Sequence, residues 1–501
     1  MSTLDLVLVN PGSRARIYQA LGTSLTAVEN PVWAGLIATY ARLKNISLEI
    51  VDAEADELTA DQTADRVLAM APRLIAVVVY GHQPSASTQN MTGASAIVSA
   101  IKARNPSARV LMIGGHVAAL PARTLAEEQC DFVTRDEGLV GVTTLVEALR
   151  ASNEPSLERI PGLVYRQGGR VAANPPAPLV MDLDRDMPGI AWDLLPMPKY
   201  RAHNWHCFGH LQRQPYAAIY TTLGCPYHCS FCCIQAPFKG GEGVIGLKQE
   251  VNSYRFWSPD RVLAEIDLLV NTYGVRNIKF ADEMFVLNQR HVLGICDRLI
   301  ERNYGLNIWA YARVDTVKDG MLDKLKRAGF NWLALGIEAA DEGVLNDANK
   351  RYMVSEVFDT VRRIKEAGIN IIGNYIFGLP EDTAKTMRST LDLALDLNCE
   401  FANFYSAMAY PGSPLYEQAI QLGWRLPDKW SGYSQHAVDT LPLPTKHLSA
   451  GEVLSFRDRA FTEYYTHRPY LDMVRDKFGT DTLAHIQSMT AHQLTRQFAT
   501  A

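Results

Sequence analysis

The sequence predicts an α/β protein with a doubly wound parallel sheet, a partial (β/α)6 barrel of the TIM type and a helical C-terminal region. Short apolar runs alternate with helical patterns along the first 150 residues, and six further strand–helix units follow a proline- and glycine-rich stretch. The chain end is mainly helical in pattern. The expected segments are a first domain at 1–150, a linker at 151–205, the barrel at 206–416 and the helical region at 417–501.

The composition is that of an ordinary globular protein of 501 residues, with 47% hydrophobic and 21% charged residues. A net charge of −5 and the lack of a lysine or arginine block argue against nucleic acid as a partner. No apolar run approaches the roughly 20 residues of a membrane span, and the start lacks a signal-peptide pattern. Four of the eight cysteines are scattered singly, unlike a secreted disulfide framework, so we expect a cytoplasmic protein.

The first domain is predicted from five near-continuous apolar strands with helical patterns between them. Parallel sheets of this kind bind ligands at the carboxyl ends of their strands. There, Gly114 and Gly115 would let a large ligand approach the backbone, and Ser85 and Ser87 offer hydroxyl groups. Glycine-bearing loops also fit a plain nucleotide-binding or regulatory sheet. The expected strands cover residues 4–11, 46–52, 74–81, 109–115 and 131–138.

The linker is punctuated by proline and glycine, and "LVYRQGGRVA" (163–172) predicts a small hairpin within it. Its polarity is too low for simple disorder, so we expect parts of it to pack on both neighbouring domains.

Three cysteines in "GCPYHCSFCC" (224–233) have the spacing Cys225-x-x-x-Cys229-x-x-Cys232. Thiolates on one loop favour an iron–sulfur cluster or zinc. Three ligands to a four-iron cluster would leave one iron open for chemistry. Zinc is the alternative, with Cys233 or His228 as a fourth ligand, although adjacent cysteines would strain to bind one ion.

The barrel is predicted from six strand-like runs, the first of which leads into the cysteines. Chemistry in such barrels belongs at the strand carboxyl ends. Polar side chains stand there on successive strands: Asp282 and Glu283, then Arg313, then Glu338. The expected strand segments are 216–224, 277–285, 306–315, 332–341, 369–382 and 399–416.

On these motifs, residues 1–416 resemble the cobalamin-dependent (class B) radical S-adenosylmethionine enzymes. The resemblance rests on the cysteine spacing, the polar strand ends and "GGH…LP…DFVTRDEG" in a Rossmann-like first domain. It departs from the pattern in three ways. No Asp-x-His-x-x-Gly motif offers a histidine to cobalt, "GIEAAD" lacks a common serine, and "RDEGL" replaces the usual Gly-Glu-Gly-Glu.

The resemblance implies a set of cofactor contacts. The three cysteines of the motif would hold a [4Fe–4S] cluster, whose open iron is chelated by S-adenosylmethionine. Phe231 and Gly378 would lie near the adenine, Asp282 and Glu283 near the amino group, and Glu338 near the ribose. Arg313 would also contact S-adenosylmethionine. The residues expected at a base-off cobalamin are Ser85, Ser87, Gly114, Gly115, His116 and Glu137.

The resemblance also implies an activity. The reduced cluster would cleave S-adenosylmethionine, and a methyl group from methylcobalamin would pass to an unactivated carbon of a small metabolite. An electron donor such as flavodoxin or ferredoxin would be a partner. The alternatives are a non-methylating cyclisation, ring contraction or oxidation with both cofactors, and a zinc-bearing sensor without catalysis.

Overall fold

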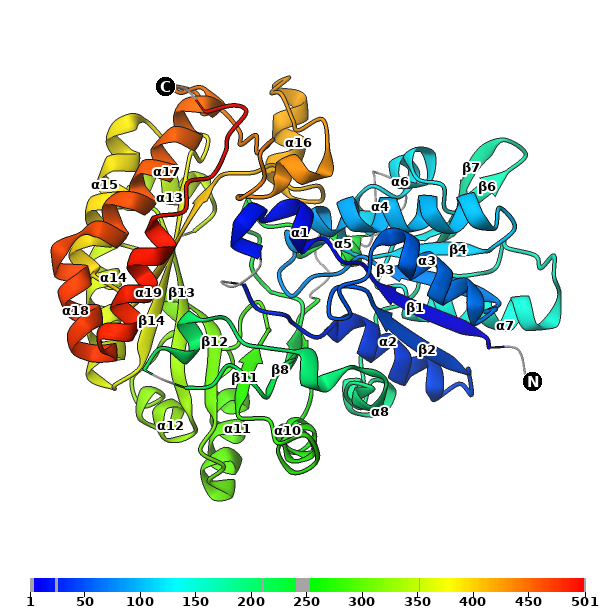
Figure 1. Ribbon diagram of the computed structural model, residues 1–501, viewed down its shortest axis with the longest axis horizontal. Helices are drawn as coiled ribbons and strands as arrows, with labels where there is room; N and C mark the ends of the chain where they lie inside the picture. Colours follow the sequence, from blue (N-terminus) through cyan, green and yellow to red (C-terminus); the bar gives the residue numbers. More distant parts are fainter. Residues whose placement is uncertain (1–3, 23–25, 210, 240–252, 351, 500–501) are drawn as a thin grey trace.

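Two large sheets organise the chain, one mainly and one entirely parallel, as the computed structural model in Figure 1 shows. The structure describes residues 4–22, 26–209, 211–239, 253–350 and 352–499. The first sheet has seven strands in the order β2-β1-β3-β4-β5-β6-β7, and the second has six in the order β15-β14-β13-β12-β11-β8. The predicted fold class is therefore confirmed.

Five strands of the first sheet are parallel and buried, which explains their continuous apolar runs. Alternate residues face opposite sides. Leu6 and Leu8 pack with α2 (Val32–Arg42) and α7 (Leu139–Ala151), whereas Val7 and Val9 pack with α3 (Ala60–Ala69) and α4 (Ala86–Arg104). The parallel strands are β1 (Leu6–Asn10), β2 (Leu48–Asp52), β3 (Leu74–Val78), β4 (Val110–Ile113) and β5 (Phe132–Thr134).

The hairpin expected in the linker is present, but it belongs to the first sheet. Strands β6 (Leu163–Gln167) and β7 (Arg170–Ala173) pair antiparallel, and β6 pairs antiparallel with β5. Beyond them, short elements lead to the barrel. These are α8 (Leu183–Asp186) and the 3₁₀ turns Trp192–Leu194, Met197–Lys199 and Trp205–Cys207.

The second sheet is the wall of a partial barrel, since its strands are all parallel and are joined by helices. Its strands are β8 (Tyr216–Ile219), β11 (Asn277–Phe280), β12 (Asn307–Arg313), β13 (Phe330–Glu338), β14 (Asn370–Phe377) and β15 (Phe401–Ser406). The surrounding helices are α10 (Pro259–Tyr273), α11 (Gln289–Arg302), α12 (Leu322–Arg327), α13 (Glu342–Asp347), α14 (Val354–Glu366) and α15 (Ala384–Leu397).

At each outer edge of this open sheet, a side chain forms hydrogen bonds to backbone groups of the edge strand. At the β8 edge, buried Asn30 donates to the carbonyl of Ala218 (3.0 Å) and accepts from its amide (2.7 Å). At the β15 edge, Gln435 makes the same pair of bonds to Ser406, at 2.9 Å each. Without such partners, buried strand edges would leave amide and carbonyl groups unpaired.

In the C-terminal region (residues 417–499), α17 (Ala450–Thr466) packs against β15, and it lies at the left of Figure 1. Arg457 of α17 donates to the carbonyl of Phe404 (2.8 Å), and Asp458 pairs with Arg457 (2.8 Å) and Arg496 (2.8 Å). None of the helices in the described part of the chain is long and apolar enough to span a membrane. The helices here are α16 (Pro414–Gln421), α17 (Ala450–Thr466), α18 (Arg468–Phe478) and α19 (Thr480–Thr490).

Candidate functional site

A cavity of about 1220 Å³ lies between the first domain and the barrel. Residues 10–14 and 80–86, on the loops after β1 and β3, form one side of it. The cysteine loop (residues 224–233) and the carboxyl ends of the barrel strands form another side, and the C-terminal region closes a third. Two sets of parallel strands therefore point their carboxyl ends at one space, which is where both folds place ligands.

The three cysteines of the motif all line this cavity. They follow the short strand β9 (Thr222–Leu223), which pairs with β10 (Arg255–Phe256) and so holds the start of the loop. Cys225 and Cys229 are buried, and Cys232 is partly exposed. Burial raises the pKa of the Cys225 thiol to about 12 and raises that of Cys229 as well. These thiols therefore stay protonated until a positively charged metal centre displaces their protons.

A guanidinium and a fourth thiol lie beside the three cysteines. Arg313 at the end of β12 points Nη1 at Cys229 Sγ (3.7 Å), pairs with Asp315 (2.9 Å) and stacks on the ring of Tyr227 (3.9 Å). Cys233 also lines the cavity. A zinc ion would need ligand atoms within about 2.3 Å of one point. In the described part of the chain, no three His, Cys, Asp or Glu side chains are placed to hold a single ion.

The donor set nevertheless fits a metal–sulfur cluster held by one loop. Three soft sulfur ligands face the same cavity, and the Arg313 guanidinium would offset negative charge on the sulfur. Cys225, Cys229 and Cys232 would hold such a cluster and would leave one of its four irons without a protein ligand. The cavity between the cysteine loop and the barrel strands has room for a further ligand.

The two acidic residues after β11 have different surroundings. Glu283 lines the cavity, and burial raises its pKa to about 8. Asp282 is fully buried, and its Oδ1 accepts from the amide and the hydroxyl of Thr221, at 2.9 Å each. Glu283 is therefore the carboxyl group of this pair that can meet a ligand, whereas Asp282 holds the end of β8 in place.

Glu338 lines the cavity at the end of β13. Its backbone has a φ of +61°, a conformation that residues other than glycine rarely adopt. The strand bulges there, because its register with β14 shifts between Gly336 and Glu338. The carboxylate forms a buried ion pair with Lys350, which also lines the cavity. Lys350 carries no periodic or motif signal in the sequence, so pattern reading missed it. Phe231 lies on the same side, with its ring 6.0 Å from Lys350 Nζ.

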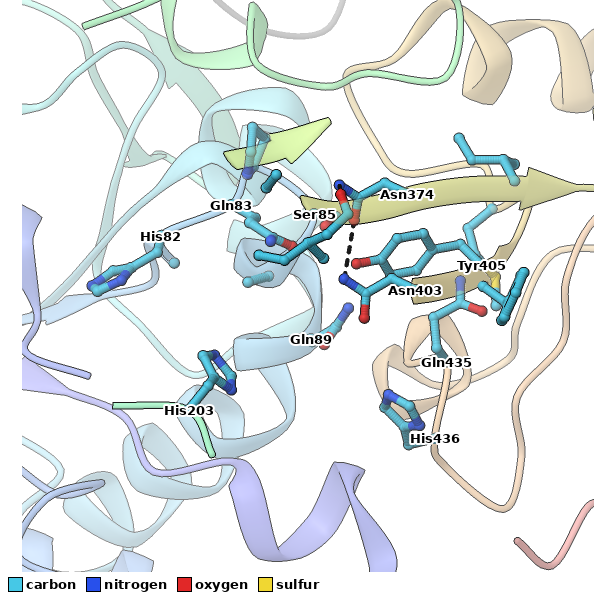
Figure 2. Close-up of a pocket in the computed structure, with 18 of the residues that line it drawn as sticks. His82, Gln83, Ser85, Gln89, His203, Asn374, Asn403, Tyr405, Gln435 and His436 are labelled. Atoms are coloured by element: carbon cyan, nitrogen blue, oxygen red, sulfur yellow. Dashed lines mark hydrogen bonds between the residues drawn. The ribbon is translucent and has the colours of Figure 1, made fainter. Parts of the chain in front are cut away.

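On the first-domain side, Ser85 lines the cavity together with amide side chains, as Figure 2 shows. Gln83 donates to the hydroxyl of Tyr311 on β12 (2.5 Å), which joins the two domains across the cavity. His82 Nε2 bonds to the carbonyl of Asn30 (2.6 Å), and its Nδ1 lies 3.0 Å from the Glu29 carboxylate, which also pairs with Lys279 (2.9 Å).

The opposite wall in Figure 2 is also rich in uncharged polar groups. Asn403 on β15 donates to Asn374 on β14 (3.0 Å), and Tyr405, Gln435 and His436 lie beside this pair. Amide and hydroxyl groups suit a ligand that itself carries many amides, as the corrin ring of cobalamin does.

Several residues expected at cobalamin do not line the cavity. The hydroxyl of Ser87 donates to the carbonyl of Val79 and accepts from the amide of His116 (2.9 Å). The His116 ring packs edge-on against Trp430 (4.4 Å), and burial lowers its pKa to about 3. Gly114 and Gly115 form the start of α5 (Gly115–Ala119), and neither of them lines the cavity. These residues build the turn that supports the ligand loops.

Glu137 and Gly378 also lie outside the lining, for different reasons. Glu137 is buried in an ion pair with Arg255 (2.5 Å), so its carboxylate faces a protein partner. Gly378 has φ of +82° and packs against Val453 of α17, where a side chain would clash. The structure thus brings together at the cavity Cys225, Cys229, Cys232, Phe231, Glu283, Arg313, Glu338 and Ser85.

Two family models match the chain in the order of its two sheets. The B12 binding domain matches residues 18–146, and the Radical SAM superfamily matches residues 219–394. The first match includes the loop after β3 and the second includes the cysteine loop, and both loops face the cavity.

Curated relatives match most of the chain. An uncharacterized methyltransferase, PH0819 of Pyrococcus horikoshii, is 28% identical over 95% of both chains. An anaerobic magnesium-protoporphyrin IX monomethyl ester cyclase of Cereibacter sphaeroides is 25% identical over 92% of this chain and 70% of its own.

Solved structures share the fold. The radical S-adenosylmethionine methyltransferase TsrM of Kitasatospora setae has a TM-score of 0.62 at 18% identity, over 83% of this chain and 76% of its own. The cobalamin-dependent S-adenosylmethionine radical enzyme OxsB has a TM-score of 0.68 at 14% identity, over 98% of this chain and 71% of its own. The chain therefore combines a B12 binding domain with a Radical SAM domain, the arrangement of cobalamin-dependent radical S-adenosylmethionine enzymes, and these two domains imply a [4Fe–4S] cluster, S-adenosylmethionine and cobalamin as cofactors.

Proposed function

We propose that this enzyme is a C-methyltransferase that passes a methyl group to an unactivated carbon of a small molecule. The observation that carries the proposal is the cavity shared by the cysteine loop and the first-domain ligand loops. When bound, the cluster supplies an electron for cleaving S-adenosylmethionine, and cobalamin supplies a methyl group. A substrate between these two surfaces can meet both in one binding event.

The chain's own residues position the cofactors and exclude water. Cys225, Cys229 and Cys232 hold the cluster at one side of the cavity, and Arg313 steadies the Cys229 sulfur. Glu283 faces the space beside the cysteines, where its carboxylate can accept a hydrogen bond from the amino group of S-adenosylmethionine.

Lys350 fixes the Glu338 carboxylate, which the strand bulge turns toward the cavity, so that it can accept from ribose hydroxyls. Substrate, S-adenosylmethionine and cobalamin would then lie between the barrel and the first domain. Support for methyl transfer comes from PH0819, which matches 95% of this chain and is named an uncharacterized methyltransferase.

A non-methylating radical reaction is the second candidate. It is favoured by the similarity to the anaerobic cyclase of Cereibacter sphaeroides, which extends over 92% of this chain. Such an enzyme would use the same cofactor surfaces but would hold its substrate so that the radical cyclises or is oxidised. The fold does not separate the two outcomes, because both place the substrate at the same strand ends.

Transfer of a labelled methyl group tests the proposal without knowledge of the substrate. The protein is reconstituted without oxygen with iron, sulfide and cobalamin, reduced, and given S-adenosylmethionine with a ¹³C-methyl group. A methyltransferase recharges its cobalamin with the label, which mass spectrometry of the extracted cofactor detects. Deoxyadenosine formation with unlabelled cobalamin would favour the second candidate.

Single cysteine substitutions test the cluster ligands. Changing Cys225, Cys229 or Cys232 to alanine is expected to abolish the bound cluster and deoxyadenosine formation, because each removes one of three ligands. Cys233→Ala is the matched control, since Cys233 lines the same cavity one residue away and is expected to retain both. Loss of the cluster in the Cys233 variant alone would contradict this assignment.

We propose a flavodoxin- or ferredoxin-type protein as the electron donor, because the cluster needs a one-electron reductant of low potential. We place the enzyme in the cytoplasm, where thiols stay reduced and such donors occur. Reduction by a purified flavodoxin system, compared with dithionite, tests the donor class through the rate of deoxyadenosine formation.

A further inference from the structure

A buried ion pair links the first domain to the segment that supports the cysteine loop. Glu137, on the loop after β5, accepts two bonds from the Arg255 guanidinium, at 2.5 and 3.1 Å. Both side chains are almost fully enclosed, with 6% and 2% of their area exposed. Arg255 also donates to the carbonyl of Val180 (2.6 Å), in the stretch between the two domains. Arg255 therefore connects its own segment to the loop after β5 and to the stretch between the two domains.

From Arg255, buried hydrogen bonds continue to the first cysteine of the motif. Arg255 Nε donates to the carbonyl of Ser253 (3.1 Å), and the Ser253 hydroxyl donates to the side chain of Gln235 (3.0 Å). Gln235 in turn donates to the carbonyl of Cys225 (2.6 Å). Backbone pairing between Arg255 and Leu223, two residues before Cys225, adds a second connection.

We propose that Glu137, acting through Arg255, is a positioning residue for the cysteine loop and hence for the cluster. The inference rests on the cluster site of the proposed function. The ion pair holds the loop against the first domain, so that the open iron and the ligand loops after β1 and β3 keep a constant separation. Glu137 touches neither cofactor nor substrate in this role, since it lies outside the cavity lining.

Energetics distinguish positioning from simple stabilisation. A buried ion pair can often be replaced by apolar side chains of similar volume without loss of stability, whereas removal of one partner leaves an uncompensated charge. A double variant without either charge can therefore keep the fold stable while it removes the anchor. If the pair only stabilises the fold, that double variant behaves like the wild type at the cluster.

The experiment uses the full-length protein, reconstituted with iron, sulfide and cobalamin, as wild type, Glu137→Gln, and the double variant Glu137→Leu with Arg255→Met. The matched control is Asp131→Asn, which weakens the Lys102 ion pair (2.7 Å) within the first domain, away from the cysteine loop. Each protein is assayed for melting temperature, for iron content and for the electron paramagnetic resonance spectrum of the reduced cluster. The Kd for S-adenosylmethionine is taken from the change in that spectrum.

We expect Glu137→Gln and the double variant to raise this Kd roughly tenfold, about the effect of one charge-assisted hydrogen bond. Their spectra with S-adenosylmethionine would be altered, and the Asp131 variant would match the wild type. A double variant with wild-type melting temperature, spectrum and Kd would overturn the proposal. If the double variant does not fold, Arg255→Lys tests the proposal instead, because lysine keeps the charge but cannot make both bonds to Glu137. A wild-type Kd for S-adenosylmethionine in Arg255→Lys would also overturn the proposal.

These readouts need only the cluster and S-adenosylmethionine. If wild-type protein fails to label its cobalamin, methyl transfer is refuted while the positioning role of Glu137 is still decided by the spectra and Kd values.

Discussion

Asn30→Ala tests whether side chains close the open edge of the barrel. Asn30 is fully buried and pairs with both backbone groups of Ala218 on the outermost strand β8. It belongs to the segment that also carries Glu29, which contacts Lys279 and His82 at the cavity wall. The substitution therefore removes one amide side chain and leaves two buried backbone groups without a partner.

The expected cost follows from those two groups. Each buried donor or acceptor left unpaired costs about 1–3 kcal/mol, so Asn30→Ala is expected to destabilise the β8 edge by about 2–6 kcal/mol. Gln435→Ala is the counterpart at the β15 edge, because it removes the same two bonds from Ser406. Asn153→Ala, at an exposed position, is the control and is expected to change stability by less than about 0.5 kcal/mol.

Hydrogen exchange is the suitable assay, because it reports local opening in a chain with more than one domain. In the wild type, the Ala218 amide is expected to exchange slowly. In Asn30→Ala, the free energy of opening calculated from its exchange rate should fall by the amount by which the β8 edge is destabilised. Unfolding by urea gives the overall effect. Unchanged protection of the Ala218 amide, or a loss below about 1 kcal/mol, would refute the reasoning.

Three further predictions concern the cavity and its supports. Because the pKa of Glu283 is about 8, its carboxyl is protonated at pH 7 in the cofactor-free protein. Affinity for S-adenosylmethionine should therefore rise between pH 7 and 9, and Glu283→Gln should lose this dependence. Gly114→Ala should lower stability by about 3 kcal/mol through a clash with a backbone carbonyl, whereas Gly115→Ala has its nearest atom at 3.6 Å and should cost under about 1 kcal/mol, both measured by thermal unfolding. Arg496→Ala breaks two bonds to Asp458, and limited proteolysis should detect a chain end loosened by about 2 kcal/mol.

The fold was accessible from the sequence because its signals are local. Five buried parallel strands read as unbroken apolar runs, and amphipathic helices separate the barrel strands, so both sheets follow from periodicity. Some predicted strands are longer than the observed ones, because polar residues that belong to the following loop were included in them. For example, residues 131–138 contain only β5 (Phe132–Thr134), because the chain then turns to place Asp136 and Glu137 in buried contacts.

The site was accessible in part. The cysteine spacing and the polar strand ends identified the residues on the barrel side, because those side chains follow their strands directly. Partners from distant segments were not accessible. Lys350 reaches Glu338 from beyond the next helix, and Arg255 reaches Glu137 across 118 residues. Such pairs depend on the packing of the two domains, which no local pattern encodes.

Several charged groups at the cavity wall are paired with neighbours of opposite charge, which affects how charged ligands arrive. Because each of these ion pairs forms a short dipole, its field decays quickly with distance, and an approaching ion is attracted only when it is close to its binding position. We therefore expect the association rate of charged ligands to change little with ionic strength, and selection among them to occur through slow departure of the correct one. The pairs concerned are Glu29–Lys279, Arg313–Asp315, Glu338–Lys350 and Arg457–Asp458.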